Sequence, residues 1–360
     1  SSANLLMYAA LQSKNAFNLP RGTKILTPVA GFPTTINPIL QLGFEPVFVD
    51  IELDTLNINL TGIENKIKEH DIKVISFAHV LGNPPNLEKI LHLCEKYKLI
   101  FLEDCCDALG STYDNKPLGS FGEMASCSFY PAHHISTGEG GMVCTNVDEL
   151  KKLFVSLSWW GRDCYCIGSA NLLACGTCGN RFDKWLDDYD GVIDHKYVFT
   201  NVGYNLKPLD LQGAIGIAQL NKFDMLESKR REYKKEIGDF IESNIKGTRV
   251  IKETAGADPS WFGVPIISDT RETKEKLQKH FENNKIQTRS YFAGNILLHP
   301  GYSHLDDYNN YPNANKALSN VFFVGCPPHY GEDIFAYYER VMASWNTDSN
   351  NYEVKATGGY

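Results

Sequence analysis

The chain has 360 residues, of which 43% are hydrophobic and 22% are charged, and its formal net charge at pH 7 is -8. This size and composition predict a globular protein with two domains, and the acidic balance argues against nucleic acid as the main partner, because phosphate binding needs a basic surface. No apolar run approaches the roughly 18 residues that span a membrane, and ten cysteines without a secretory signal predict a cytoplasmic protein whose thiols are reduced or bind a metal.

The first half of the chain alternates short apolar runs with helical patterns. The apolar runs predict strands at residues 24–27, 46–49, 73–78, 99–103, 125–129 and 141–145. The helical patterns predict helices at residues 2–11, 33–42, 61–68, 87–96 and 147–157. This alternation is typical of βαβ units, so we predict an α/β fold with a mostly parallel central sheet, helices on both of its faces, and functional groups at the carboxyl ends of the strands.

The second half of the chain is predicted to be more helical. One long helical pattern starts at Leu206 and runs towards Ile245, with a charged stretch at 227–232 that indicates a solvated face. Beyond it we expect a strand at 261–267 and helices at 272–284 and 335–345. We therefore predict a large domain over residues 1–225, with a cysteine-rich insertion at about 159–185, and a smaller α+β domain over residues 226–360.

Residues 128–141 read Ser-Phe-Tyr-Pro-Ala-His-His-Ile-Ser-Thr-Gly-Glu-Gly-Gly. This frame resembles the cofactor-lysine segment of the nucleotide-sugar aminotransferases, which are fold-type I enzymes that use pyridoxal phosphate. The resemblance implies an aminotransferase-like fold, and it places His133 where the family has the lysine that forms a Schiff base with the coenzyme. A histidine cannot form that bond, but it moves protons near neutral pH, so the substitution suggests a changed reaction with His133 as the catalytic residue.

Two other interpretations compete for this pair of histidines. A histidine in a loop is commonly a structural residue, and His134, directly beside His133, is an alternative catalytic residue. The family spacing favours His133, because four residues separate it from Gly138, as they separate the lysine in aminotransferase frames.

An acidic residue follows the predicted buried strand at 99–103. Asp104 by itself is compatible with a helix cap. The resemblance implies a second role, because the family has an aspartate at the matching place of a Glu-Asp-x-x-x-Ala motif, where its carboxylate pairs with the pyridine nitrogen of the coenzyme. Asp107, in the same segment, is a further candidate for coenzyme binding.

The resemblance also implies where the coenzyme phosphate and ring bind. Ser2 and Ala3 lead a predicted helix, whose N-terminus favours an anion, and Ser128 stands where the family has a serine that contacts the phosphate. Asn205, alone a turn residue, matches a family asparagine that reaches the phosphate of a neighbouring subunit, which implies a homodimer. Phe32 stands where an aromatic ring stacks on the pyridine, although core packing explains it equally well. Because the chain begins inside this phosphate motif, we expect upstream residues to be missing from the sequence.

Four cysteines form a second pattern, namely Cys106, Cys164, Cys166 and Cys178. Their arrangement resembles the iron–sulfur dehydratases that descend from the sugar aminotransferases and act on CDP-linked 4-keto-6-deoxy sugars, in which four cysteines hold a [2Fe–2S] cluster. The resemblance implies the same metal ligands here, with a longer loop before Cys178 that leaves Cys175 as an alternative fourth ligand. By spacing alone, four thiolates suit a [2Fe–2S] cluster or Zn²⁺, and free thiols fit as well.

Together with the resemblance, these residues predict a lyase that uses pyridoxamine phosphate (or pyridoxal phosphate) to remove the C3 hydroxyl of a nucleotide-diphosphate 4-keto-6-deoxysugar, for the 3,6-dideoxyhexoses of lipopolysaccharide O-antigen. A cluster that passes single electrons implies a flavin/iron–sulfur reductase as a partner. A cluster-free sugar dehydratase, a sugar aminotransferase, and a non-catalytic protein that binds a nucleotide sugar or zinc stay open as alternatives. The lost lysine argues against the aminotransferase, and the retained Asp104, Ser128 and Asn205 argue against the non-catalytic protein.

Overall fold

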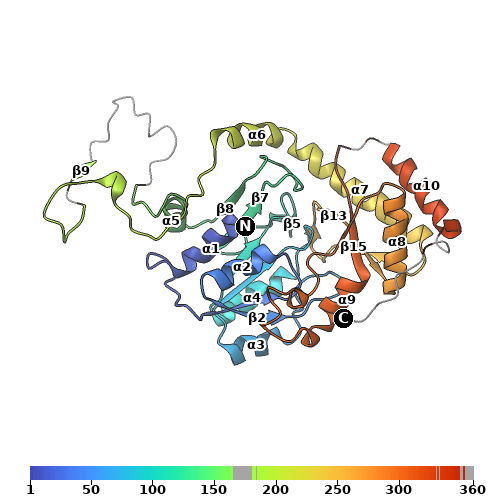
Figure 1. Ribbon diagram of the computed structural model, residues 1–360, viewed down its shortest axis with the longest axis horizontal. Coiled ribbons are helices and arrows are strands. Elements are labelled where there is room, and N and C mark those ends of the chain that lie inside the picture. Colours follow the sequence, from blue (N-terminus) through green and yellow to red (C-terminus); the bar gives the residue numbers. More distant parts are fainter. Residues whose placement is uncertain (165–180, 184, 330, 332, 349–351, 353–360) are drawn as a thin grey trace.

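The computed structural model describes residues 1–164, 181–183, 185–329, 331, 333–348 and 352. Within these residues the chain forms a large body around one sheet and a smaller body around another (Figure 1). Among the described helices, none is both long enough and apolar enough to cross a membrane.

The large body is built on a six-stranded sheet with the strand order β2-β1-β3-β4-β7-β8. Its strands are β1 (Lys24–Pro28), β2 (Glu45–Val49), β3 (Val74–Ala78), β4 (Ile100–Asp104), β7 (Met124–Ser128) and β8 (Gly141–Cys144). All neighbouring strands pair in parallel except β8, which runs antiparallel to β7. The predicted α/β fold with a mostly parallel sheet is confirmed, and the predicted strands lie at nearly the same residues.

Helices cover both faces of this sheet. Neighbouring residues of a strand point to opposite faces, and the apolar runs supply a large side chain to each. On β1, Ile25 packs into one core cluster and Leu26 into another, and on β3 Val74 and Ile75 divide in the same way. Helices α1, α2 and α5 close the first cluster, and α3 and α4 close the second. Their bounds are α1 (Ser2–Gln12), α2 (Pro33–Gln41), α3 (Ile63–His70), α4 (Leu87–Tyr97) and α5 (Asp148–Ser158).

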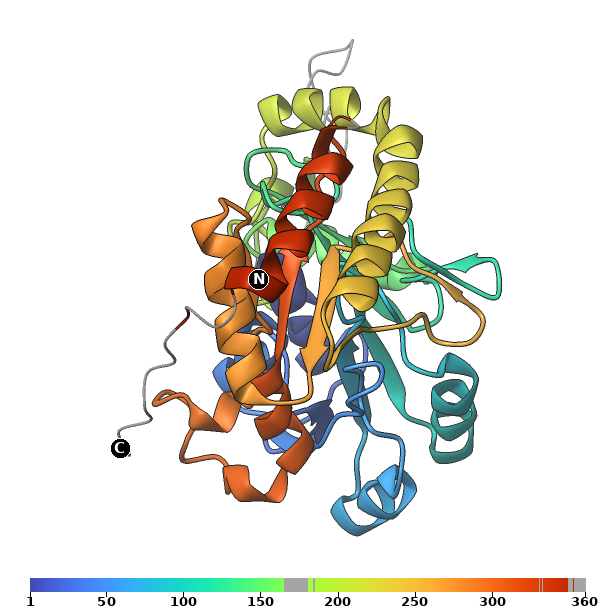
Figure 2. The ribbon, with the colours of Figure 1, turned by 90° about the vertical axis from the view of Figure 1, so that its right-hand side faces the viewer.

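The smaller body has an antiparallel sheet in the order β11 (Thr248–Val250), β13 (Gly263–Ser268), β15 (Val321–Gly325) and β14 (Thr288–Ser290). Figure 2 shows its helices, which are α7 (Phe223–Asn244), α8 (Arg271–Asn283), α9 (Pro312–Asn320) and α10 (Asp333–Asp348). The predicted strand and the two predicted helices of this region correspond to β13, α8 and α10. No prediction covered β15, although it is a buried apolar run between β13 and β14.

The long helical pattern after Leu206 forms two helices rather than one. Helix α6 (Asp210–Leu220) ends before Asn221, and α7 begins at Phe223. No side chain of α6 is buried in this chain, although the helix carries several large apolar residues. The predicted domain division between residues 225 and 226 falls within α7 and remains a prediction.

Short elements complete the described chain. A three-stranded sheet in the order β12 (Ala257–Asp258), β5 (Thr112–Tyr113) and β6 (Lys116–Pro117) joins the two halves of the chain. The pair β9 (Phe182–Asp183) and β10 (Ile193–Asp194) lies at the left edge of Figure 1. Three short 3-10 helices are η2 (His195–Tyr197), η3 (Ile296–Leu298) and η4 (Tyr308–Asn310).

Candidate functional site

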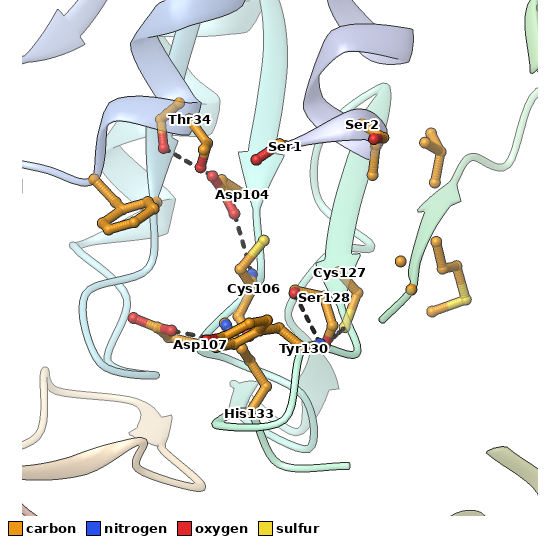
Figure 3. Close-up of a pocket in the computed structure, with 18 of the residues that line it drawn as sticks. Ser1, Ser2, Thr34, Asp104, Cys106, Asp107, Cys127, Ser128, Tyr130 and His133 are labelled. Atoms are coloured by element: carbon orange, nitrogen blue, oxygen red, sulfur yellow. Dashed lines mark hydrogen bonds and ion pairs between the residues drawn. The ribbon is translucent and has the colours of Figure 1, made fainter. Parts of the chain in front are cut away.

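A cavity of about 810 Å³ opens where the parallel strands end (Figure 3). Pro28, Ala78, Asp104 and Ser128 are the last residues of β1, β3, β4 and β7, and all four line it. Phe262, from the second half of the chain, lines it as well. Because the carboxyl ends of parallel strands meet at one edge of the sheet, residues that are far apart in the sequence come together here.

Asp104 is almost fully buried at the end of β4, and hydrogen-bond donors surround it. Its Oδ2 accepts hydrogen bonds from Asn4 Nδ2 and Thr35 Oγ1, each 2.8 Å long. Its Oδ1 accepts one from the backbone N–H of Cys106 at 3.1 Å (Figure 3). Three donors fit a carboxylate, and such a carboxylate on a cavity wall suits a protonated pyridine nitrogen. The sequence analysis missed Asn4 and Thr35; the available signal for Asn4 was a polar residue within an apolar helix.

His133 lines the cavity from the loop after β7. Its Nδ1 donates a hydrogen bond to the carbonyl oxygen of Cys106, because a carbonyl oxygen only accepts. The neutral imidazole therefore carries its proton on Nδ1, and Nε2 is its basic nitrogen. Burial lowers the pKa of His133, whose ring centre lies 5.3 Å from that of Phe262, so the neutral form prevails at pH 7.

His134 has a different environment. It is not among the described residues that line the cavity, and its Nε2 lies 2.9 Å from the hydroxyl oxygen of Ser260. That hydroxyl donates its own proton to the carbonyl oxygen of Leu109 at 2.6 Å, so His134 Nε2 is the donor to Ser260. Burial lowers the pKa of His134 well below the ordinary histidine value, which keeps it neutral. Of the two histidines, His133 is therefore the better candidate for chemistry in the cavity.

Asp107 lies beside the N–H side of the His133 imidazole. Its Oδ1 is 3.6 Å from His133 Nδ1, and both side chains are mostly shielded from solvent. Burial, with the charge of Asp104 as the next cause, raises the pKa of Asp107 to about 8. At neutral pH the carboxyl group is therefore largely protonated. A neutral Asp107 does little to stabilise a protonated imidazole, in agreement with the lowered pKa of His133.

The predicted phosphate contacts line the same cavity. Ser2 and Ala3 from the first turn of α1, and Ser128 at the end of β7, all line it. First-turn amide groups lack partners within their helix, so this end of α1 favours an anion. Asn205 lines the same cavity from the segment before α6. Phe32 lines it too, and its exposed fraction of 51% excludes the interpretation of this ring as a core residue in this chain.

Of the predicted cluster ligands, Cys106 and Cys164 belong to the described residues, whereas Cys166 and Cys178, and the alternative Cys175, lie outside them. Cys106 lines the cavity next to Asp104, and Cys164 is half-buried. Burial raises the pKa of the Cys106 thiol well above its ordinary value. A coordinated metal deprotonates a thiol regardless of such burial, so Cys106 remains compatible with a ligand role.

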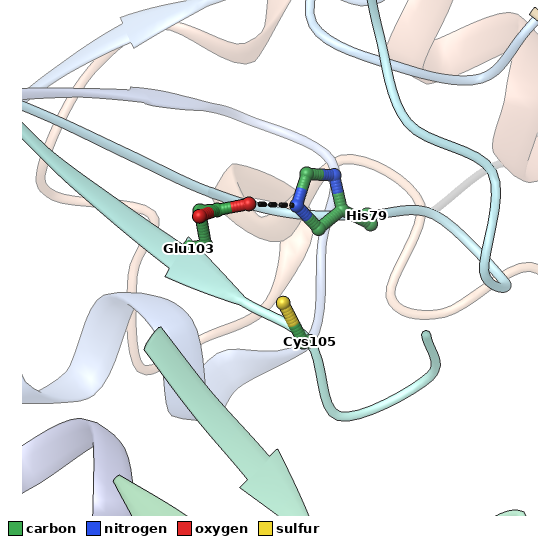
Figure 4. Close-up of side chains that lie close together, drawn as sticks. All are labelled: His79, Glu103 and Cys105. Carbon is green, nitrogen blue, oxygen red and sulfur yellow. Dashed lines mark hydrogen bonds and ion pairs between the residues drawn. The ribbon is translucent and has the colours of Figure 1, made fainter. Parts of the chain in front are cut away.

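A second group of potential metal ligands, His79, Glu103 and Cys105, is buried and is not part of the described cavity lining (Figure 4). Glu103 Oε2 lies 2.9 Å from His79 Nε2 and accepts the backbone N–H of Gly119 at 3.0 Å. Glu103 Oε1 accepts the N–H groups of residues 121 and 122 at 2.8 and 2.7 Å. These four donors occupy the acceptor positions of the carboxylate, so we interpret the group as structural, anchoring the loop after β6.

Comparison with known proteins gives consistent matches over most of the chain. Residues 1–343 match the model of the DegT/DnrJ/EryC1/StrS aminotransferase family. The lipopolysaccharide biosynthesis protein RfbH of Salmonella typhimurium is 40% identical over 334 residues, which are 91% of this chain and 75% of RfbH. The dTDP-4-dehydro-2,6-dideoxy-D-glucose 3-dehydratase of Saccharopolyspora spinosa is 38% identical over 97% of this chain and 76% of its own length.

A solved structure agrees with these matches. E. coli GDP-4-keto-6-deoxy-D-mannose-3-dehydratase with bound hydrated PLP superimposes with a TM-score of 0.80 and 30% identity, and the match covers 95% of this chain and 85% of that one. The predicted aminotransferase-like fold is thereby confirmed.

Proposed function

The chain belongs to the DegT/DnrJ/EryC1/StrS aminotransferase family, and on that basis we propose that it removes the C3 hydroxyl of a nucleotide-linked 4-keto-6-deoxyhexose. In this proposal the enzyme uses pyridoxamine phosphate and a [2Fe–2S] cluster, in the synthesis of 3,6-dideoxyhexoses for lipopolysaccharide O-antigen. The names of its relatives, two sugar 3-dehydratases and a lipopolysaccharide biosynthesis protein, support it. The observation that carries it is a neutral histidine, His133, where the family has its cofactor lysine.

The residues around the cavity suit the coenzyme. Asp104 would hold the pyridine nitrogen, and Phe32 would lie against the ring. The first turn of α1, with Ser2 and Ala3, would hold the phosphate together with Ser128. When bound, the coenzyme supplies an amine that condenses with the C4 ketone of the sugar and a ring that withdraws electrons from it.

His133 would move the protons. Its Nε2 is the basic nitrogen and would take the proton from the C4′ carbon of the coenzyme, while the bond from Nδ1 to the carbonyl oxygen of Cys106 keeps the ring in place. The protonated imidazole would then pass that proton to the departing C3 hydroxyl, which leaves as water. A lysine in this position would tether the coenzyme instead, so the histidine disfavours the aminotransferase alternative.

The reaction also needs electrons, because loss of water leaves an unsaturated product. We propose that Cys106, Cys164, Cys166 and Cys178 hold a [2Fe–2S] cluster, with a flavin/iron–sulfur reductase as the electron donor. Cys106 supports this idea, because it lies two residues after Asp104 and lines the cavity in which the coenzyme would bind.

Replacement of the proposed base tests the dehydration step. His133→Asn should leave pyridoxamine phosphate bound but slow the washout of C4′ hydrogen label by roughly two to four orders of magnitude, which is the usual contribution of a general base. Washout is measured in protein loaded with labelled coenzyme and a 4-keto-6-deoxy nucleotide sugar. His92→Asn, at an exposed histidine on α4, is the matched control and should behave as wild type. Rapid washout in the His133 variant would remove this residue from the mechanism.

The lowered pKa of His133 predicts the pH dependence of the same washout. The active form is the unprotonated imidazole, and burial extends that form to lower pH. The rate should therefore hold as the pH falls to the ordinary histidine value of about 6.5 and decline only below it. A decline that begins above that pH contradicts the assignment.

The cluster is tested by iron and sulfide analysis with a cysteine variant. Cys164→Ser should lose the visible iron–sulfur absorption and full turnover with the reductase, yet keep the washout of C4′ label, because dehydration precedes electron transfer. Cys94→Ser, at a cysteine on α4 outside the cavity, should keep both properties. Three results would contradict the proposed cluster: full turnover in the Cys164 variant, zinc in place of iron, or a wild-type enzyme without any metal. The last of these would indicate a cluster-free dehydratase.

We also propose that the enzyme is a homodimer that pairs through α6. Leu209, Leu211, Ile217 and Leu220 on and beside this helix are 58% to 68% exposed, and such a concentration of apolar side chains is typical of an interface. The segment before α6 carries Asn205, whose family counterpart reaches into a neighbouring subunit.

The oligomeric state should respond to charge on this helix. Light scattering of the wild type should give twice the chain mass of 40.4 kDa, and a Leu211→Glu, Ile217→Glu double variant should give a monomer, because two carboxylates cannot be buried unpaired in an apolar interface. Val147→Glu, at an exposed apolar residue before α5, is the control and should remain dimeric. A monomeric wild type would contradict the proposal.

A further inference from the structure

At the edge of the cavity, two positively charged side chains lie close to the same two indole rings. Lys207 Nζ lies 3.5 Å from the ring centre of Trp160 and 5.6 Å from that of Trp159. The guanidinium carbon of Arg162 lies 4.8 Å and 5.7 Å from the same two centres. We call these four residues the cationic cage.

The backbone holds the cage together where two segments cross. Trp159 and Asn205 form a β-bridge. Two glycines make the crossing possible: a Cβ on Gly161 would lie 1.8 Å from the carbonyl oxygen of Asn201, and one on Gly203 would lie 2.3 Å from the nitrogen of Gly161. Gly161 also has a φ of +82°, in the left-handed region that favours glycine. The approach of the two cations is therefore fixed by the chain and does not depend on flexible side chains alone.

The charges of the cage are not neutralised within the described part of the chain. Neither Arg162 nor Lys207 forms an ion pair there; Lys207 Nζ donates instead to the amide oxygen of Asn205 at 2.7 Å. Asp163, the acid next to Arg162, lies 3.2 Å from His195 Nε2. Desolvation and then the Arg162 guanidinium lower the pKa of Lys207, in agreement with mutual repulsion of the two cations. An anion placed between them would relieve that repulsion.

The cage also contains donors that await an acceptor. Arg162 Nε and Trp159 Nε1 are both shielded from solvent, and neither has a hydrogen-bond partner among the described residues. A buried donor without a partner is costly, and such groups are rare in folded proteins. Their presence beside two unneutralised cations points to a bound group rich in acceptor oxygens.

The rest of such a ligand would lie in the cavity. Lys207 and Asn205 line it, so an anion held by the cage would continue into the space beside His133. Trp160 is 41% exposed, so part of its indole ring is accessible to a flat base. We propose that Arg162 and Lys207 bind the diphosphate of the substrate's nucleotide, with the base against Trp160. This inference rests on the proposed function, which supplies a nucleotide-linked sugar as the substrate.

Binding measurements separate this assignment from a role in holding the coenzyme phosphate. Protein loaded with pyridoxamine phosphate is titrated by calorimetry with inorganic pyrophosphate and with CDP, GDP and dTDP. Arg162→Gln and Lys207→Gln should each weaken pyrophosphate, and the nucleotide that binds the wild type, by roughly 10- to 100-fold, because each removes a charge-assisted contact. The affinity for pyridoxamine phosphate should not change.

Two further variants are controls for misfolding and for general charge effects. Lys207→Arg keeps the positive charge and should retain most of the affinity, and Lys196→Gln, at an exposed lysine on η2, should bind as wild type.

Three results would overturn the assignment: no binding of any of these diphosphates by the wild type, unchanged affinity in both glutamine variants, or loss of pyridoxamine phosphate affinity with diphosphate affinity intact. If dehydration fails while diphosphate binding still depends on both cations, the proposed reaction is wrong and the cage is supported.

Discussion

One hydrogen bond determines what His133 can do. Its Nδ1 donates to the carbonyl oxygen of Cys106, so the lone pair of the neutral imidazole is on Nε2, and burial keeps that form at pH 7. The same bond connects the loop after β7 to the loop after β4, which follows Asp104 and carries Asp107. The proposed base, the proposed partner of the pyridine nitrogen and a candidate cluster ligand are therefore held as one unit.

In two pairs of neighbouring residues, one side chain lines the cavity and the other is buried in the protein. Asp104 lines the cavity, whereas Glu103 before it points into the protein and accepts hydrogen bonds from His79 and from loop amides. His133 lines the cavity, whereas His134 after it is buried against Ser260. Asp104 and His133 thus each have a buried neighbour that is hydrogen-bonded within the protein, which limits how far these two groups can move.

Local patterns in the sequence predicted the sheet well, because a strand buried on both faces needs a continuous apolar run. The helices that cover the sheet need apolar residues at a different spacing, every three to four positions, so the two patterns can be told apart. The resemblance located His133 and Asp104, and the structure brings both to one cavity. The partners of contacts between distant segments could not be predicted. Asn4 and Thr35 reach Asp104 from separate helices, and although Asn4 stands out as a polar residue in an apolar helix, nothing local identifies Asp104 as its partner. The break between α6 and α7 was missed because the helical sequence pattern continues across Asn221. The helix itself is interrupted there, between Leu220 and Phe223.

We infer that an imidazole has replaced the covalent anchor of the coenzyme. Treatment of the pyridoxal-phosphate-loaded protein with borohydride, followed by mass spectrometry of the denatured chain, tests it most directly, because borohydride makes a Schiff base permanent. We expect an unmodified chain and free reduced coenzyme, because His133 cannot form a Schiff base. A chain that carries a pyridoxyl group on any lysine would contradict it.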